Sequence, residues 1–307
     1  MSHPFEHPAS GALLERVATL YQSRGIRTAK DRHIIFVCGG RARGPSSGRT
    51  MRARFIKYAA SRLKKYRIFL AEAAYRDFVS QTGDDFFNVA QFETLIAQVS
   101  DCLVLFPESP GSFAEAGFFS HADEIRRKIL LVVDSRRQSV DSFINIGPID
   151  LINTHSKFKS ALQIPYSSRV SHFKHIRERI QNRIPTQLTA TFSFGEEGQL
   201  SFRNKIYLVY DFISLFKAIR IEGLEHALKT CFPRTDFSEL RQILSILIAG
   251  RYLARSPSNE EFLITGKNAH HFLEFSKPHL RKKIETRILI FYRTHAIESF
   301  DIARVTK

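Results

Sequence analysis

Glu115 is the residue whose type and setting are best suited to chemistry in this sequence. It follows an apolar segment at 102–106 and a turn containing Pro110 and Gly111, and it stands where a helix is expected to begin. Backbone N–H groups in the first turn of a helix lack helical partners, and the helix dipole stabilises a negative charge there and lowers its pKa. An ionised carboxylate is the nucleophile that glycosyl transfer needs at an anomeric carbon.

The same residues also match a helix cap. Ser112 and Glu115 stand three positions apart, as in the capping box, where the Ser side chain caps the helix and the Glu reaches back to the Ser backbone N–H. Taken alone, these residues favour the cap over the nucleophile, because such short motifs often occur by chance.

Strands alternate with helices in the first half of the chain, judged by hydrophobic periodicity. This alternation predicts an α/β fold with a doubly wound parallel sheet of the Rossmann type. Right-handed crossovers would place the strand-to-helix loops at one sheet edge, where such folds bind nucleotides. The expected strands are 33–38, 67–70, 102–106 and 129–133, and the expected helices are 12–22, 51–65, 88–99 and 112–126.

Further candidate residues fall in the predicted loops at that edge. A second catalytic acid could come from Asp77 or Glu72, although acids after a strand are as often simple helix-start polarity. A backbone without Cβ permits close approach of a phosphate or ribose. The predicted nucleotide-binding residues are Gly39, Gly40, Glu72, Tyr75, Ser109, Gly111, Ser112 and Asn145, the last with a turn role as the favoured alternative.

Other polar residues carry weaker signals. Phosphate clamping by arginines of the loop at 41–50 is as well explained by solvated loop charges. His172 and His175 have no suitably spaced Cys or carboxylate partner, so no metal site is predicted.

The composition is strongly basic. Lys and Arg number 46 against 30 Asp and Glu, which gives a net charge of +16. Such a charge attracts polyanions, and it favours nucleic acid over an anionic membrane or over solubility alone. The three cysteines are far apart, residues 1–10 show no signal-peptide pattern, and no apolar run approaches membrane-spanning length. We therefore expect a soluble cytoplasmic protein.

The chain is expected to divide into three parts. Residues 1–150 would form the catalytic domain with an N-terminal helix, 151–203 a basic connecting region, and 204–307 a mostly α-helical domain. The last part has the outline of a winged helix-turn-helix. Its expected helices are 206–219, 223–230, 236–250 and 267–275, with short strands near 251–253 and 262–266.

Several motifs resemble those of retron-associated effector proteins. They are Phe-Pro-Glu-Ser-Pro-Gly-Ser-Phe-Ala-Glu-Ala-Gly at 106–117, Phe-Val-Cys-Gly-Gly at 36–40, Arg-Arg-Lys at 126–128 and Ser-Phe-Ile-Asn-Ile-Gly-Pro at 142–148. Those effectors resemble nucleoside 2-deoxyribosyltransferases, whose catalytic Glu lies in a similar turn-to-helix motif. The resemblance implies that Glu115 is the nucleophile and that the C-terminal domain is a winged helix. The transferases carry an Asp shortly before the motif's Gly, where this chain has Ser109 and Pro110.

The resemblance also implies a function. Such an effector would be an antiphage toxin that cleaves the N-glycosidic bond of NAD or of a purine (deoxy)nucleotide, with no further cofactor. It would be an oligomer in a complex with the retron reverse transcriptase and multicopy single-stranded DNA, which hold it inactive. A non-catalytic nucleotide-sensing DNA-binding regulator is the main alternative, and a phosphoribohydrolase is a third.

Overall fold

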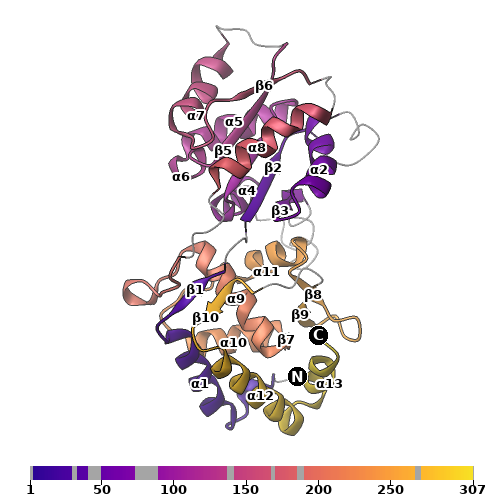
Figure 1. Ribbon diagram of the computed structural model, residues 1–307. Coiled ribbons are helices and arrows are strands. Elements are labelled where there is room, and N and C mark those ends of the chain that lie inside the picture. Colours follow the sequence, from indigo (N-terminus) through magenta and orange to yellow (C-terminus); the bar gives the residue numbers. More distant parts are fainter. Residues whose placement is uncertain are drawn as a thin grey trace. The chain divides into compact units, whose positions relative to one another are not determined.

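The computed structural model describes residues 3–29, 33–40, 50–72, 89–136, 142–166, 170–184, 190–266 and 271–306. These residues form two compact units, shown in Figure 1. The described residues between 33 and 184 make up an α/β unit, and residues 3–29 and 190–306 make up a mainly helical unit.

The α/β unit is built on a parallel sheet with the strand order β3-β2-β4-β5-β6. The chain leaves the interior strand β2 for the edge strand β3 and then returns to β4 on the other side of β2, so the order of strands reverses between β2 and β4. Ligands of open α/β sheets bind outside the carboxyl ends of the strands at such a switch point. The strands are β2 (His33–Cys38), β3 (Tyr66–Phe69), β4 (Cys102–Leu105), β5 (Ile129–Asp134) and β6 (Leu162–Ile164).

Helices cover both faces of this sheet because successive side chains of a strand point to opposite sides. Ile35 and Val37 of β2 belong to a core formed with α2 (Met51–Arg62) and α8 (Phe173–Arg183). Phe36 points the other way and contacts Phe119 of α5 edge to face, at 6.4 Å between ring centroids. The remaining helices of the unit are α4 (Val89–Val99), α5 (Pro110–His121), α6 (Asp123–Arg126), α7 (Asp150–His155), η3 (Asn145–Ile149) and η4 (Val170–His172). The α/β class with a parallel sheet is thereby confirmed.

The helical unit contains two small antiparallel sheets. One has the order β7-β9-β8, and the other pairs β1 with β10. The strands are β1 (Ile26–Thr28), β7 (Ala218–Arg220), β8 (Leu253–Arg255), β9 (Phe262–Thr265) and β10 (Leu273–Phe275). The helices are η1 (Pro4–Glu6), α1 (Ser10–Gln22), η5 (Glu196–Gly198), α9 (Phe202–Phe216), α10 (Ile221–Cys231), α11 (Leu240–Ala249), α12 (Pro278–His295) and α13 (Ile297–Val305). No described helix is both long and apolar enough to cross a membrane.

The N-terminal helix α1 belongs to the helical unit, which differs from the division expected from the sequence. Its apolar stripe is buried, and α1 packs on α10 and α12. The hydroxyl of Tyr21 donates a 2.7 Å hydrogen bond to Oδ2 of Asp211 on α9, whose side chain is 0% exposed. Arg281 of α12 lies 3.4 Å from the other oxygen of that carboxylate. The buried carboxylate of Asp211 on α9 thus contacts side chains of both α1 and α12.

Three other expectations need correction. The single helix expected at 112–126 is two helices, α5 and α6, separated at Ala122, whose ψ of 106° is not helical. The expected connecting region includes α7, β6 and α8, which belong to the α/β unit because their apolar residues complete its core. The helix expected at 267–275 is wrong at residues 273–275. These residues form the strand β10, which pairs with β1 in an antiparallel sheet.

Candidate functional site

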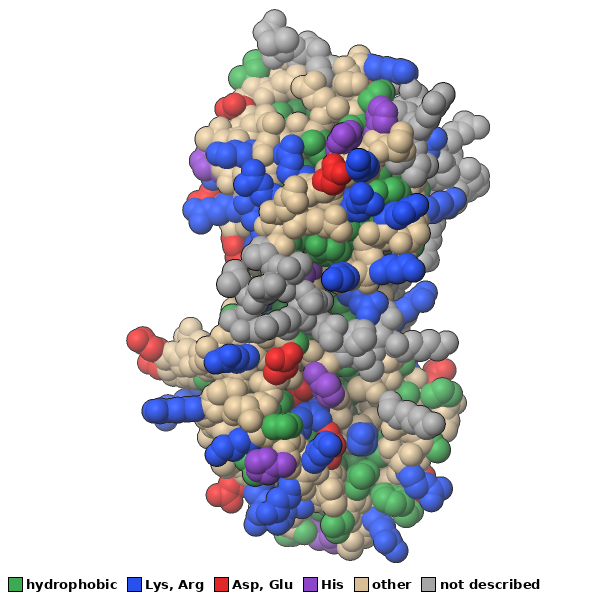
Figure 2. Space-filling model, in the orientation of Figure 1, with side chains coloured by type: hydrophobic (Ala, Val, Ile, Leu, Met, Phe, Trp, Pro, Cys, Tyr) green, Lys and Arg blue, Asp and Glu red, His purple; other side chains and the backbone are tan. Residues whose placement is uncertain are grey.

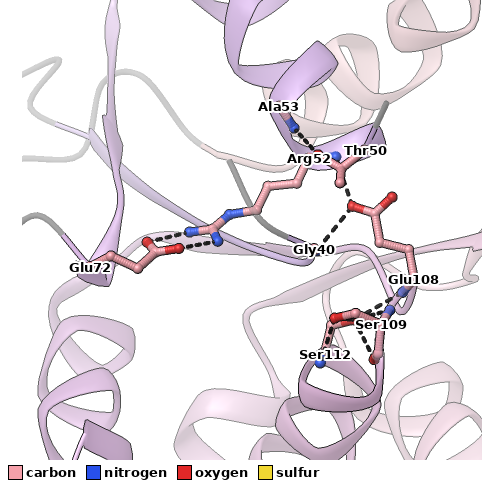
Figure 3. A network of polar contacts seen from close by, with 8 residues as sticks. All are labelled: Gly40, Thr50, Arg52, Ala53, Glu72, Glu108, Ser109 and Ser112. Atoms are coloured by element: carbon pink, nitrogen blue, oxygen red, sulfur yellow. Dashed lines mark hydrogen bonds and ion pairs between the residues drawn. The ribbon is translucent and has the colours of Figure 1, made fainter. Parts of the chain in front are cut away.

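The turn before α5 is held by two serines. Ser109 is the N-cap, and its Oγ accepts the backbone N–H of Ser112 at 3.3 Å. The hydroxyl of Ser112 in turn accepts the backbone N–H groups of Glu108 and Ser109, each at 2.9 Å (Figure 3). The capping box is therefore Ser109 with Ser112, and the expected box of Ser112 with Glu115 is wrong. Helix α5 begins two residues earlier than expected because Pro110 suits its first position.

Glu115 consequently lies in the second turn of α5, away from the free N–H groups of the helix end. Its pKa is raised to about 8, first by burial and then by the charge of Glu93, with a smaller contribution from Glu72. Arg52 opposes this shift. The expectation of a lowered pKa is corrected, since burial among other acids outweighs the helix dipole at this position. The Oε2 atom of Glu115 is buried and has no hydrogen-bond partner among the described residues.

Glu93 on α4 is the neighbour that the sequence reasoning did not identify. Its pKa is raised to about 7 by burial and by the charge of Glu72, while Arg52 acts to lower it. Two carboxyl groups with pKa values displaced toward neutrality, one beside the other, are typical of sites that transfer protons. Glu93 lies within a helix, where an acid is usually a solvated surface residue, so no local pattern marked it.

Arg52 is the cation of this cluster. Its guanidinium forms a bidentate pair with Glu72, with Nη1–Oε1 and Nη2–Oε2 distances of 2.5 and 2.7 Å (Figure 3). The Arg52 side chain is 5% exposed and that of Glu72 is 50% exposed. The pair joins the first turn of α2 to the segment after β3. The Arg52–Glu72 ion pair therefore lies at the same edge of the sheet as Glu115 and Glu93.

The predicted phosphate cradle at Gly39 and Gly40 is occupied by a carboxylate of the protein itself. Glu108 accepts the backbone N–H groups of Gly40, Met51 and Arg52 at 3.0, 2.7 and 3.1 Å. Gly39 is required there, because its φ is 151° and a Cβ atom would come within 3.0 Å of Arg52 Cβ. These glycines therefore let Glu108 reach the N-terminus of α2, and nucleotide binding at Gly39 and Gly40 stays a prediction.

The other predicted site residues divide into three groups. Gly111 is exposed at the start of α5, and a Cβ added there would meet no atom within 4 Å. Asn145 is the first residue of η3, a turn of π-helix that packs against α5, so it lies in a helical turn near the site. Asp77, Tyr75 and the arginines at 41, 43 and 49 lie outside the described residues.

The arrangement combines a parallel-sheet switch point with a cluster of carboxyl groups. Glu72, Glu93 and Glu115 come from three different elements and influence one another electrostatically around Arg52. The thiol of Cys38, at the end of β2, has its pKa raised well above the usual value by burial and by the Glu115 charge, so it stays protonated. Among the described residues, no group of three His, Cys, Asp or Glu is placed to hold a metal ion. The cluster is suited to acid–base work and to stabilising a positive charge.

An α/β protein with carboxyl groups at the switch point of a parallel sheet is the class that this fold and site define. The family of the STM3845 retron effector protein matches residues 48–255, and the chain belongs to this retron effector family.

Two curated relatives come from Escherichia coli. The chain is 34% identical over 142 residues to "Retron Ec86 putative ribosyltransferase/DNA-binding protein", covering 46% of this chain and 43% of the relative. It is 28% identical over 125 residues to "Retron Ec73 putative ribosyltransferase/DNA-binding protein", covering 40% of this chain and 39% of the relative. The matches therefore span less than half the length of these relatives.

Proposed function

We propose that this retron effector cleaves the N-glycosidic bond of NAD or of a purine (deoxy)nucleotide, with the Glu115 carboxylate as nucleophile. The observation that carries the proposal is the meeting of Glu115, Glu93 and Glu72 at the sheet's switch point. The ribosyltransferase names of the two relatives agree with chemistry at an anomeric carbon.

The two buried carboxyl groups would divide the chemistry. A Glu115 oxygen bonds to C1′ of the sugar while the bond from C1′ to the base nitrogen breaks and its electron pair passes to the base. For a purine, Glu93 gives the departing nitrogen a proton. Water then attacks C1′, frees the Glu115 carboxylate and returns a proton to Glu93. For NAD, the cationic nicotinamide takes the electron pair and leaves as a neutral base without a proton, so Glu93 keeps its own proton and the proton of the attacking water passes to solvent.

Electrostatics explain why a carboxyl group with a raised pKa still suits this role. The transition state of glycosyl transfer carries positive charge on the sugar, and a nearby positive charge lowers the pKa of a carboxyl group. The acidic cluster would therefore release the Glu115 proton as a cationic substrate or transition state forms. Arg52 forms an ion pair with Glu72, so its positive charge is already balanced by a carboxylate of the site.

The direct test compares the purified chain with Glu115→Gln on NAD, dATP and AMP, with free base measured by mass spectrometry. Glutamine keeps the size of the side chain and cannot act as the nucleophile, so we expect base release to fall by about 10³-fold or more. Glu124→Gln, an equal change on exposed α6, is the control and should retain the wild-type rate. Wild-type rates with Glu115→Gln would show the nucleophile assignment to be wrong, and release from AMP alone would indicate a phosphoribohydrolase.

We further propose that the retron reverse transcriptase and its multicopy single-stranded DNA hold the effector inactive. Membership of the retron effector family supports this proposal. Expression of the chain alone should deplete a cellular pool of NAD or purine nucleotide and release the base. Co-expression of the two partners should prevent the depletion, and Glu115→Gln should abolish it without them.

We also propose that α9 to β9 form a winged helix. The support is the element order helix, strand, helix, helix, strand, strand, with the three strands in one antiparallel sheet of order β7-β9-β8. A non-catalytic nucleotide-sensing regulator is the second candidate, favoured by the high pKa of Glu115, which keeps this carboxyl group protonated at neutral pH. Nucleotide binding without base release by the wild type would support the regulator.

A further inference from the structure

A groove of about 730 Å³ lies on the α/β unit between α2 and α8. It is separate from the carboxylate cluster, because none of Glu72, Glu93 and Glu115 lines it. Figure 2 shows Lys and Arg side chains gathered over the part of this unit where α2 and α8 lie. The lining residues are Arg54, Lys57, Tyr58, Ser61, Arg62, Ser171, Lys174 and Arg177.

Cations stand on both walls of this groove. Arg54, Lys57 and Arg62 come from α2, and Lys174 and Arg177 come from α8. On α2, residues 57 and 58 follow residue 54 by three and four positions, and on α8 residue 177 follows residue 174 by three. Side chains at these spacings lie on one face of a helix. The lining contains no carboxylate among the described residues.

The acid beside the groove neutralises little of this charge. Glu178 lies 3.6 Å from Lys174, but the two side chains are 42% and 62% exposed, and pairs this exposed are weak. The Nε atom of Arg177 is buried and has no hydrogen-bond partner among the described residues. The groove therefore offers cationic groups that an anionic ligand can bind.

An aromatic side chain is fixed between the cations. Tyr58 packs against Phe55 and Phe173, at 6.4 and 5.6 Å between ring centroids, and it also lines the groove. A ring held by two others keeps its orientation before a ligand arrives. A cationic groove with a fixed aromatic ring is the combination by which proteins bind single-stranded nucleic acid, with phosphates on the cations and a base stacked on the ring.

In the helical unit, α11 and the turn between β8 and β9 offer few free cations to phosphates, although the strand order of this unit resembles that of DNA-binding domains. Helix α11 carries one cation, Arg241, in the sequence Leu-Arg-Gln-Ile-Leu-Ser-Ile-Leu-Ile-Ala. The turn between β8 and β9 carries Glu260 and Glu261, and Arg220 is paired with Glu261 at 3.3 Å. Acids at that turn would repel a duplex backbone.

We propose that the α2–α8 groove binds single-stranded nucleic acid, with its five cations on consecutive phosphates and Tyr58 stacked on a base. Cations on both walls suit one strand lying between them, whereas a duplex would present its phosphates to only one wall at a time. The proposal stands on this groove alone and does not depend on the catalytic role of Glu115.

The test measures binding of a fluorescein-labelled oligothymidylate of about 12 nucleotides to the whole chain by anisotropy at several salt concentrations. Five phosphate contacts predict a slope of log K against log salt of about −3.5. Lys57→Ala with Arg62→Ala should weaken binding at least tenfold and reduce the slope by about 1.4. The matched control is Lys64→Ala with Lys65→Ala, which removes two exposed cations of the following turn and should change binding by less than about twofold.

Stacking has its own variants. Tyr58→Phe keeps the ring and should bind like the wild type, while Tyr58→Leu keeps an apolar side chain and should weaken binding by about tenfold. Thermal unfolding of each variant shows that the fold is retained. Wild-type affinity and slope in the Lys57 and Arg62 double variant would overturn the proposal. So would equal affinity for tripolyphosphate or for a blunt duplex of the same length, which would indicate a small-anion site or a duplex site.

Discussion

At the scale of single residues, Glu115 is governed by its neighbours more than by its place on a helix. Burial and the charges of Glu93 and Glu72 act in one direction on its pKa, and Arg52 acts in the other. Two measurable properties therefore depend on the same carboxyl group. One is the stability of the fold as a function of pH, and the other is the pH at which the proposed nucleophile becomes ionised.

Stability should fall as pH rises through the range in which Glu115 titrates. The unfolded chain releases this proton near 4.5, the usual pKa of a glutamate, whereas the folded chain keeps it up to about 8. Between these values the folded state binds more protons, so the free energy of unfolding decreases with rising pH. Glu115→Gln removes the effect, and its melting temperature relative to the wild type should increase from pH 5 to pH 8. Glu124→Gln should show no such trend, and parallel curves for Glu115→Gln and the wild type would contradict the prediction.

The pH dependence of base release should move in opposite directions when the two flanking charges are removed. With NAD, whose base leaves without a proton from Glu93, the rate of the wild type should rise with pH toward an apparent pKa of about 8 if ionised Glu115 is required. Glu93→Gln removes a negative charge and should move this rise to lower pH, whatever it does to the maximum rate. Arg52→Gln removes a positive charge and should move the rise to higher pH, while Arg52→Lys should largely restore it. Shifts of the same sign in both neutral variants would contradict this assignment.

At the scale of elements, the loop after β2, the start of α2 and the segment after β4 are joined by one carboxylate. Glu108 accepts three backbone N–H groups from Gly40 and from the first residues of α2. Thr50 caps the same helix through its Oγ1, which accepts the N–H of Ala53 at 3.2 Å. The position of Arg52 therefore depends on Glu108 as well as on its own pairing with Glu72.

Glu108→Ala should destabilise the chain by about 2–3 kcal/mol, because it leaves buried N–H groups without an acceptor. Glu108→Gln keeps one acceptor oxygen and should lie between the alanine variant and the wild type. Ser61→Ala, an exposed change on the same helix, is the control. Urea unfolding measures all three variants. Equal midpoints for Glu108→Ala and Ser61→Ala would contradict the bridging role.

Four of the five strands of the parallel sheet could be predicted from the sequence, whereas the short edge strand β6 and the contacts between the loops could not. Buried strands such as 33–38 and 129–134 have continuous apolar runs, so their existence and type are local properties. The meeting of Glu93 with Glu115 depends on how α4 and α5 pack on the sheet, which no local spacing encodes. The start of α5 could not be predicted for a similar reason. Ser109 and Ser112 both match a helix cap in sequence, and only the backbone conformation shows that Ser109 is the N-cap. The strand β10 was missed because its partner, β1, is distant in sequence.

At the scale of the whole molecule, the chain holds two compact units, each with its own core. The helical unit is built around the fully buried Asp211, which accepts the Tyr21 hydroxyl and lies 3.4 Å from the 11% exposed Arg281. This contact joins residues that are 190 positions apart in sequence. It explains why the first helix is part of a unit that is otherwise formed by the second half of the chain.

Asp211→Ala should destabilise the helical unit by about 3–5 kcal/mol, because Arg281 and the Tyr21 hydroxyl lose the buried carboxylate that they share. Tyr21→Phe removes a single hydrogen bond to the same carboxylate and should cost about 1–2 kcal/mol. Hydrogen exchange locates the effect, since amide protection follows the cooperative unit in which each amide lies. Protection should fall in α1, α9 and α12, while β2, β4 and β5 should exchange as in the wild type because their apolar contacts lie in the other core. Equal loss of protection in these strands would mean that the two cores unfold as one.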